Sequence, residues 1–352
     1  MPELADPRTV TASLAVPRRV LDRQTAAAIL DDALVPADAG LDAESWPIGA
    51  AMLQFPSVAP GGKSVRDAGP DHWHRQLRRL RREGFGHVEI PSAWLPIGEM
   101  TSDERSALVA ALADLDLSIC ATSMVRMSVI DPDPARADEN VAATHRGIDA
   151  AAEVGAPLVC LGLHEALFPE QTAVPWFWTV PGPANPPDRV LWDRAVARFR
   201  ELSEHARAVG VQLSIEVYEG TFLGDADSAV AFITDIDRDN VGLNPDLGNL
   251  VRAQRPIEPW EAIAVKLLPL ANYWHVKNYV RIESPLEDVF YSAPATLPVG
   301  LIDYRKAVRY AIAQGFRGAF LAEHYGGDGL GVSAENARYL RGLIADALED
   351  QS

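Results

Sequence analysis

From residue 48 onward, short runs of apolar residues alternate with longer stretches in which apolar residues recur at helical spacing. The short runs predict eight strands, over residues 48–55, 87–90, 117–123, 157–164, 211–217, 241–244, 271–275 and 318–323. The longer stretches predict helices, among them 72–83, 102–114, 135–154, 191–209 and 304–314. Strands that alternate with helices form parallel βαβ units. Eight such units in a chain of 352 residues favour an α/β fold of the closed (β/α)8 TIM-barrel type over an open sheet.

Glycine marks the predicted end of several helices. It stands in the pairs Glu83-Gly84, Val154-Gly155, Val209-Gly210 and Gln314-Gly315, each shortly before a predicted strand. Glycine ends helices because it adopts the left-handed backbone conformation without steric cost. No glycine-rich dinucleotide or P-loop motif follows any strand, which argues against the open nucleotide-binding folds.

Three segments exceed what a minimal barrel needs. Residues 1–45 predict an N-terminal extension, with one helix around residues 21–33, that packs on a catalytic barrel of residues 46–352. Residues 165–188 and 278–302 predict long loops after the fourth and seventh strands. Barrel enzymes carry their active sites at this C-terminal face, so both loops are expected to border the site.

Composition excludes several classes of function. The formal net charge is -17, and 32 basic residues stand against 49 acidic ones, so the overall field repels nucleic acid. No run approaches the roughly 20 apolar residues that span a bilayer, and the N-terminus lacks the apolar core of a secretion signal. Cys120 and Cys160 lie in apolar strands and are expected to be reduced core thiols, which suits a cytoplasmic protein.

Ionisable residues fall at the ends of four consecutive predicted strands. Because side chains alternate between the two faces of a strand, Glu216, Asp246, His275 and Glu323 are all expected to turn into the barrel. Three carboxylates that converge with one imidazole repel one another unless a cation compensates them. The pattern therefore predicts one divalent metal, with Mn²⁺, Mg²⁺ or Co²⁺ favoured by the oxygen-rich donor set and Zn²⁺ left open.

Each of these residues also has a simpler interpretation. An acid at a strand end is often a solvated loop residue or a helix cap, and Asp246 is placed to cap a short turn through Gly248. His275 alone reads equally well as a core histidine. The joint occurrence of one candidate on each of four neighbouring strands favours the metal site.

Four short motifs resemble those of the xylose isomerase-like barrel superfamily, which includes sugar isomerases and ketose 3-epimerases. They are Ser214-Ile-Glu-Val217, Asn244-Pro-Asp-Leu-Gly-Asn249, His275-Val-Lys-Asn278 and Glu323-His-Tyr-Gly326, in the family's order. The resemblance implies that the four ligands hold a metal, usually manganese. It also implies that Glu216 and Glu323 exchange protons with the substrate and that Arg281 contacts a substrate oxygen. Asn249 stands where the epimerases often have histidine.

Length and long insertions make the chain most similar to the large subunit of C-glycoside deglycosidases. That resemblance implies a lyase that removes a proton next to the ketone of a 3-oxo-glycoside and eliminates the aglycone. It also implies a small second subunit, although a homo-oligomer is an alternative partner. The competing interpretation is a metal-dependent ketose or sugar-phosphate isomerase or epimerase, and a non-catalytic sugar-binding barrel is a third.

Further residues are candidates for the substrate pocket. His164 ends the fourth predicted strand and is expected to act as a general acid or base, or else to bond a loop carbonyl. Lys277 shares the inward face with His275, and Glu89 faces inward on the second strand. Lys277 from its inward position, and Asn249 and Arg281 from the resemblance, are expected to bind a sugar or glycoside substrate. In the first long loop, the aromatic residues 176–178 are expected to form a stacking wall for the substrate, or else to bury the loop or to make a subunit contact.

Overall fold

Eight parallel strands form a nearly closed barrel in the computed structural model, which describes residues 14–36 and 40–349. They are β1 (Ile48–Ala51), β2 (His87–Pro91), β3 (Ser118–Met124), β4 (Leu158–Leu161), β5 (Gln212–Glu216), β6 (Val241–Asn244), β7 (Trp274–Val276) and β10 (Phe320–Ala322). Their order around the barrel is β6-β5-β4-β3-β2-β1-β10-β7. A parallel bridge between Leu243 and Ala271 spans the gap between β6 and β7. The predicted TIM barrel is confirmed.

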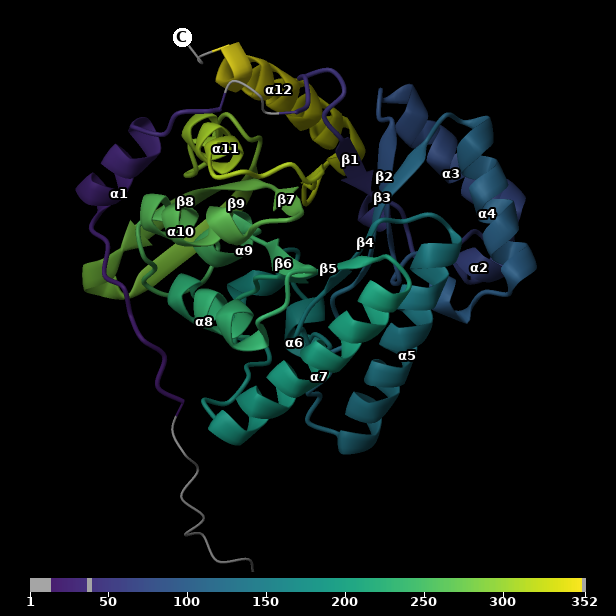
Figure 1. Cartoon of the computed structure of the whole chain (residues 1–352), viewed down its shortest axis with the longest axis horizontal. Coiled ribbons are helices and arrows are strands. Elements are labelled where there is room, and N and C mark those ends of the chain that lie inside the picture. Colours follow the sequence, from purple (N-terminus) through teal and green to yellow (C-terminus); the bar gives the residue numbers. More distant parts are fainter. Residues whose placement is uncertain (1–13, 37–39, 350–352) are drawn as a thin grey trace, which may run out of the picture.

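The helices surround the strands as an outer layer (Figure 1). They are α1 (Arg23–Asp31), α2 (Val65–Ala68), α3 (Pro70–Arg82), α4 (Ser102–Asp114), α5 (Pro134–Glu153), α6 (Pro169–Thr172), α7 (Arg189–Ala208), α8 (Ala226–Ile236), α9 (Leu247–Val251), α10 (Trp260–Leu267), α11 (Tyr304–Ala313) and α12 (Gly329–Glu349). No helix in the described part of the chain is both long and apolar enough to span a bilayer.

The predicted glycine stops are confirmed. Gly84, Gly155, Gly210 and Gly315 have φ angles of 94°, 77°, 78° and 93°, in the left-handed region. Each lies within two residues of the end of the preceding helix. These glycines let the chain leave the helix and turn back toward the next strand.

Three strand boundaries differ from those predicted by three residues or more. β1 ends at Ala51 because residues Met52–Gln54 wind into a 3₁₀ helix, and β4 ends at Leu161, so that His164 lies in the following loop. β7 begins at Trp274 because Ala271 makes only the bridge to β6. In each case the apolar run continues past the paired residues, and the run alone cannot show where pairing stops.

The barrel interior is filled by side chains from alternate positions of the strands. Its buried cluster comprises Ala51, Cys120, Ala121, Leu158, Cys160, Tyr273 and Leu321. Both cysteines are buried and free, as expected. Burial raises the pKa of Cys120 to about 12, so this thiol stays protonated at neutral pH. This cluster fills the inside of the barrel with apolar and thiol side chains.

Helix α1 of the N-terminal extension packs against α10 and α11 (Figure 1). Its Ala26 and Leu30 are buried, and Asp31 pairs with Lys306 of α11 at 2.7 Å. Of the expected extension 1–45, residues 1–13 and 37–39 lie outside the described residues.

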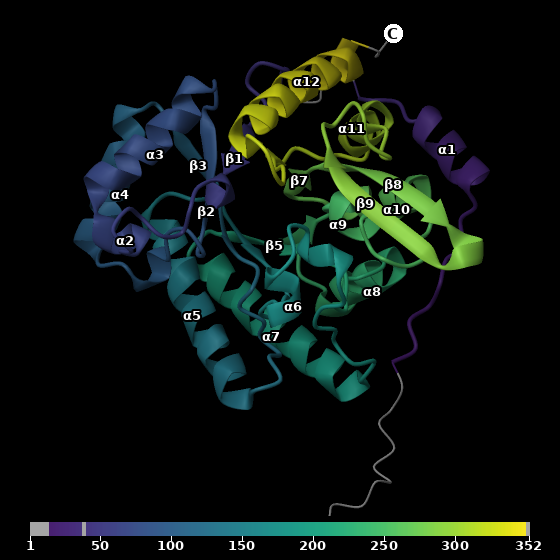
Figure 2. The same cartoon turned by 180° about the vertical axis from the view of Figure 1, so that it is seen from behind.

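The insertion after β7 forms an antiparallel hairpin that the sequence did not predict. It consists of β8 (Asn278–Ser284) and β9 (Val289–Ala295) and lies beside α9 and α10 in Figure 2. The insertion after β4 holds the short helix α6 and a 3₁₀ turn, Phe177–Thr179, but no strand. Both insertions follow the C-terminal ends of barrel strands and shape the mouth of the barrel.

Candidate metal centre

The four predicted ligands lie together at the C-terminal end of the barrel. Glu216 ends β5, Asp246 comes two residues after β6, His275 is the middle residue of β7, and Glu323 directly follows β10. None of the four is more than 5% exposed. The four side chains therefore converge at the mouth of the barrel, two from within strands and two from the residues that follow strands.

Distances within the group suit one shared ion. Ligand atoms of Glu216, Asp246 and His275 all lie within 4.8 Å of one another. Oε2 of Glu323 lies 3.6 Å from Nδ1 of His275, and Oε1 of Glu216 lies 3.7 Å from the same nitrogen. A three-residue cluster that can bind a metal is therefore present, with the fourth predicted ligand beside it.

The imidazole of His275 has a hydrogen-bond partner at one of its two nitrogens, among the described residues. Its Nε2 lies 2.8 Å from Oε2 of Glu89, whereas its Nδ1 is buried and has no hydrogen-bond partner among the described residues. A buried ring nitrogen without a partner is costly unless a ligand fills its place. Together with the carboxylates around it, this nitrogen fits a divalent cation that prefers oxygen and imidazole.

Lys277 supplies a positive charge inside the group. Its Nζ lies 2.6 Å from Oδ2 of Asp246 and 2.8 Å from Oε2 of Glu323, and its side chain is 3% exposed. Burial alone would lower the pKa of Lys277, but these two carboxylates outweigh it and raise the pKa well above its ordinary value. The lysine therefore stays charged and compensates two of the predicted ligands.

The crowded carboxylates have displaced pKa values. Burial raises the pKa of Asp246 to about 7, helped by Glu323 and Glu216 and opposed by Lys277. Burial also lowers the affinity of His275 for a proton, but Glu89 and Glu216 outweigh it and raise the pKa of His275 well above its ordinary value. Groups with such opposed environments are typical of functional sites.

Asp246 and Asn249 join the site to helix α9. Asp246 caps this helix, since its Oδ1 accepts a hydrogen bond from the backbone of Asn249 at 3.2 Å. The side-chain amide of Asn249 donates to Oε1 of Glu216 at 2.8 Å and to the carbonyl of Val217 at 3.0 Å. Capping and ligation are thus compatible for Asp246, and Asn249 orients a predicted ligand.

Arg281 lies apart from the central cavity. Its guanidinium donates to the carbonyls of Val251, Ala253 and Arg255 at 2.6–2.9 Å, and it is not among the residues that line the cavity over the four ligands. The substrate contact that the resemblance implied would require it to leave these carbonyls. In this structure Arg281 ties the β8–β9 hairpin to the segment after α9.

Arg252 is a buried cation that the sequence did not reveal. It is 0% exposed and makes a two-pronged pair with Glu219 at 2.8 and 3.1 Å. Its guanidinium also lies over the rings of Phe177, Trp178, Tyr218, Tyr279 and Tyr325. Arg252 follows the short helix α9. The alternation of side chains that gives their direction in a strand does not apply there.

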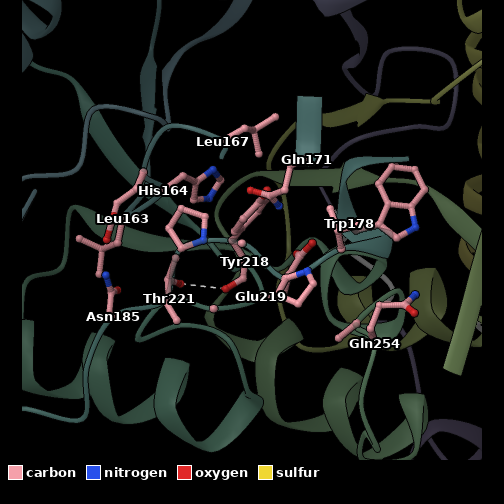
Figure 3. A pocket seen from close by; sticks show the side chains of 18 of the residues that line it. Leu163, His164, Leu167, Gln171, Trp178, Asn185, Tyr218, Glu219, Thr221 and Gln254 are labelled. Atoms are coloured by element: carbon pink, nitrogen blue, oxygen red, sulfur yellow. Dashed lines mark hydrogen bonds between the residues drawn. The ribbon is translucent and has the colours of Figure 1, made fainter. Parts of the chain in front are cut away.

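Two cavities meet at the mouth of the barrel. A central cavity of about 130 Å³ is lined by Glu216, His275, Lys277 and Glu323 among others. An outer cavity of about 270 Å³ lies under the insertion after β4, and Figure 3 shows its lining. Arg126, His164 and Tyr218 line both cavities.

His164 lies at this junction, although it comes three residues after β4 and does not end the strand as predicted. Its ring stacks on Tyr218, with centroids 3.8 Å apart, and both side chains are labelled in Figure 3. Its Nε2 is buried without a hydrogen-bond partner among the described residues. Burial lowers the pKa of His164 to about 3, which leaves a neutral imidazole facing the pocket.

The aromatic residues of the insertion after β4 pack mainly inward. Trp176 and Trp178 stack at 5.4 Å, and Trp178, which is 4% exposed, donates to the carbonyl of Ser292 in β9. Of residues 176–178, Trp178 lines the outer cavity. These contacts support the interpretation in which the side chains bury the loop, and Trp178 alone of the three lines the outer cavity.

The chain is similar in sequence to a known protein family. The sequence profile described as "Xylose isomerase-like TIM barrel" matches residues 77–343. The chain belongs to this family. None of the proteins of curated function gives a significant sequence match.

Among solved structures, a xylose isomerase-like TIM barrel protein from Mycobacterium smegmatis in complex with magnesium is 44% identical to this member of the family. The similarity covers 88% of this chain and 99% of that one, with a TM-score of 0.83. An L-ribulose 3-epimerase is 20% identical over 87% and 96% of the two chains (TM-score 0.57). A D-psicose 3-epimerase from Clostridium cellulolyticum H10 is 16% identical over 87% and 98% (TM-score 0.57). At these lower identities the likeness shows a shared fold.

Proposed function

We propose that this xylose isomerase-like barrel is a divalent-metal-dependent enzyme that removes a proton from the carbon next to a carbonyl group of a carbohydrate. The supporting observation is the position of Glu216 and Glu323, which both lie within 3.7 Å of Nδ1 of His275, a nitrogen with no hydrogen-bond partner in the described part of the chain. A cation held there by Glu216, Asp246, His275 and Glu323 would polarise a carbonyl oxygen and stabilise the negative charge that forms on it.

Side chains of the protein would supply proton transfer and substrate binding. We assign proton transfer to Glu216 or Glu323, whose carboxylates face the central cavity. Lys277 and Asn249, which line the same cavity, orient substrate oxygens. Because Lys277 lines this cavity and Arg281 is not among its lining residues, we assign the cationic substrate contact to Lys277 in place of Arg281.

The lyase version of this activity uses both cavities. A 3-oxo-glycoside would place its sugar in the central cavity and its aglycone in the outer one, with His164 at the junction between them. Transfer of the C2 proton to Glu216 or Glu323 would expel the aglycone from C1, and the neutral imidazole of His164 would relay a proton to the leaving group, giving up its N–H proton while its other nitrogen takes up the proton from the carboxyl group. This is the C-glycoside deglycosidase type of reaction, and the outer cavity of about 270 Å³ supports it.

The isomerase or epimerase version uses the central cavity alone. Its volume of about 130 Å³ suits one monosaccharide, and two proteins with this fold are 3-epimerases by name. Return of the proton to the same or a neighbouring carbon would then complete the reaction. We therefore retain an isomerase or epimerase activity as a second candidate function.

We expect manganese as the native metal, with magnesium or cobalt as alternatives. Magnesium is the metal found in the M. smegmatis relative. We also propose a partner, either a small second subunit or another copy of the chain. The β8–β9 hairpin supports this, since it exposes Val280, Ile282 and Tyr291. The buried free thiols support the expected cytoplasmic location.

Proton NMR in D₂O tests these proposals. The purified protein, stripped with a strong chelator and reloaded with Mn²⁺, is incubated with 3-oxo-C-glycosides or with free ketoses. Free aglycone with an unsaturated ketose supports the lyase, and deuterium uptake into an intact sugar supports the epimerase. Glu216→Gln should abolish either reaction. Turnover that persists in the chelator-stripped protein would overturn the metal-dependent chemistry, and sugar binding without turnover would favour a non-catalytic barrel.

A further inference from the structure

We infer that Glu89 is a positioning residue of the metal centre: its carboxylate accepts the Nε2 proton of His275 and so turns the Nδ1 lone pair toward the cation. This inference rests on the metal centre proposed above. It concerns a residue outside the predicted ligand set, on the opposite edge of the imidazole ring.

Glu89 is a buried acid with three hydrogen-bonded neighbours. It lies in the middle of β2, at 0% exposure. Its Oε2 accepts from the hydroxyl of Tyr273 at 2.8 Å and lies 2.8 Å from Nε2 of His275, and its Oε1 accepts from the hydroxyl of Ser123 at 2.9 Å. Contacts from β3, from β7 and from the residue directly before β7 therefore fix the orientation of this carboxylate.

The partner of one ring nitrogen decides what the other nitrogen does. A neutral imidazole carries one proton, and only the nitrogen without it can bind a metal. A carboxylate is solely an acceptor when ionised, so Glu89 holds the proton on Nε2. When a metal displaces the second proton of the ring, the Nδ1 lone pair of His275 is the one left to bind it, which agrees with the position of Nδ1 between Glu216 and Glu323.

Glu89 cannot share the same ion with Nδ1 of His275. The two ring nitrogens point away from opposite edges of the imidazole, and the 2.8 Å contact is made on the Nε2 side. A carboxylate in this position orients a metal-bound histidine and strengthens it as a donor. Removal of such a partner typically costs about 10–100-fold in metal affinity.

Tyr273 provides a matched control. Its hydroxyl donates to the same oxygen of Glu89, and it shares the inward face of its segment with His275. Tyr273→Phe therefore removes one hydrogen bond from Glu89 without touching the imidazole. If Glu89 only fills the barrel core, the two substitutions should alter folding stability and leave metal affinity unchanged.

Isothermal titration of the chelator-stripped full chain with Mn²⁺ tests the inference. We expect Glu89→Gln to weaken Mn²⁺ binding about 10–100-fold and Tyr273→Phe to weaken it by less than about threefold, with thermal unfolding confirming that both variants are folded. An unchanged dissociation constant in folded Glu89→Gln would overturn the inference. Absence of Mn²⁺ binding by the wild type would instead overturn the metal centre itself.

A measurement on the wild type covers the case in which Glu89→Gln does not fold. Long-range ¹H–¹⁵N spectra of the Mg²⁺-loaded protein distinguish the two imidazole tautomers, and His275→Gln assigns the signal among the eight histidines. We expect the proton of His275 on Nε2. A proton on Nδ1 in the loaded protein would show that Glu89 does not set the tautomer.

Discussion

The ammonium nitrogen of Lys277 lies 2.6 Å from Oδ2 of Asp246, and both side chains are buried. The same nitrogen lies 2.8 Å from Glu323. One protein cation therefore compensates two of the carboxylates that we assign to the metal. Lys277 and the divalent ion share the task of balancing the negative charge in the barrel mouth.

Lys277→Met should make the protein depend more strongly on its metal. Removal of one partner from a buried ion pair typically costs about 3–5 kcal/mol, because the remaining charge is uncompensated. Saturating Mn²⁺ restores compensation, so we expect a larger rise in the thermal midpoint for the variant than for the wild type. Lys277→Arg keeps the charge and is the control. Equal rises in all three proteins would show that Lys277 and the metal do not share these carboxylates.

His164→Asn should lower kcat without removing a titration from the neutral range. Because burial lowers the pKa of His164 to about 3, its imidazole is neutral throughout pH 5–8 and its charge does not change there. General acid–base residues contribute about 10²–10⁴-fold to rate. We expect a loss of that order in kcat, with the apparent pKa values of the pH–rate profile unchanged. His205→Asn, at an exposed ion pair with Asp149, is the control. A limb near pH 6.5 that disappears in His164→Asn would contradict the neutral imidazole.

Much of the fold could be predicted because the barrel repeats one simple pattern. The hairpin β8–β9 was missed although Val280 and Ile282 alternate with Arg281 and Glu283. The usual expectation places apolar residues toward the core. Here Arg281 turns inward to bind backbone carbonyls and Ile282 is 65% exposed, so the pattern is inverted.

The candidate site also contains residues that the sequence could predict and residues that it could not. Alternation along strands indicated that Glu89, Glu216 and His275 face inward, because a strand position fixes the direction of its side chain. It gave no indication of Arg252, which follows a five-residue helix. Nor does it show that Lys277 pairs with Asp246, since that contact depends on the distance between two different strands.

Glu104→Gln should destabilise the protein at neutral pH and much less in acid. Glu104 pairs with both prongs of Arg66 and accepts from the backbone of Thr101, which caps α4. The Arg66 hydrogen bonds lower its pKa from 4.5 to about 2. A lowered folded-state pKa stabilises the protein above the unfolded value, and this contribution is lost as pH falls from 4.5 toward 2.

Because both side chains are 31% exposed, we expect a loss of about 1 kcal/mol in the free energy of unfolding at pH 7. Urea unfolding at pH 7 and pH 3 measures it. The exposed Glu335 of α12 serves as the control position, with Glu335→Gln expected to have no effect at either pH. An equal deficit of Glu104→Gln at both pH values would show that charge pairing is not its cause.

Arg252→Met should weaken the mouth of the barrel chiefly by leaving Glu219 without its partner. Arg252 is fully buried and Glu219 is 19% exposed, so the stranded carboxylate is largely shielded from water. We expect a loss of about 3 kcal/mol in the free energy of unfolding, measured by urea denaturation. The double variant Arg252→Met with Glu219→Gln should recover part of this loss, because no uncompensated charge remains.

Additive effects of the two substitutions would contradict this account and would assign the stability to the contacts of Arg252 with the surrounding rings. Arg252→Lys separates these contributions further. Lysine keeps the charge but lacks the planar two-pronged geometry that fits a carboxylate and stacks on Phe177 and Trp178. We expect it to retain only part of the stability, and limited proteolysis should then cut the insertion 165–188 faster than in the wild type.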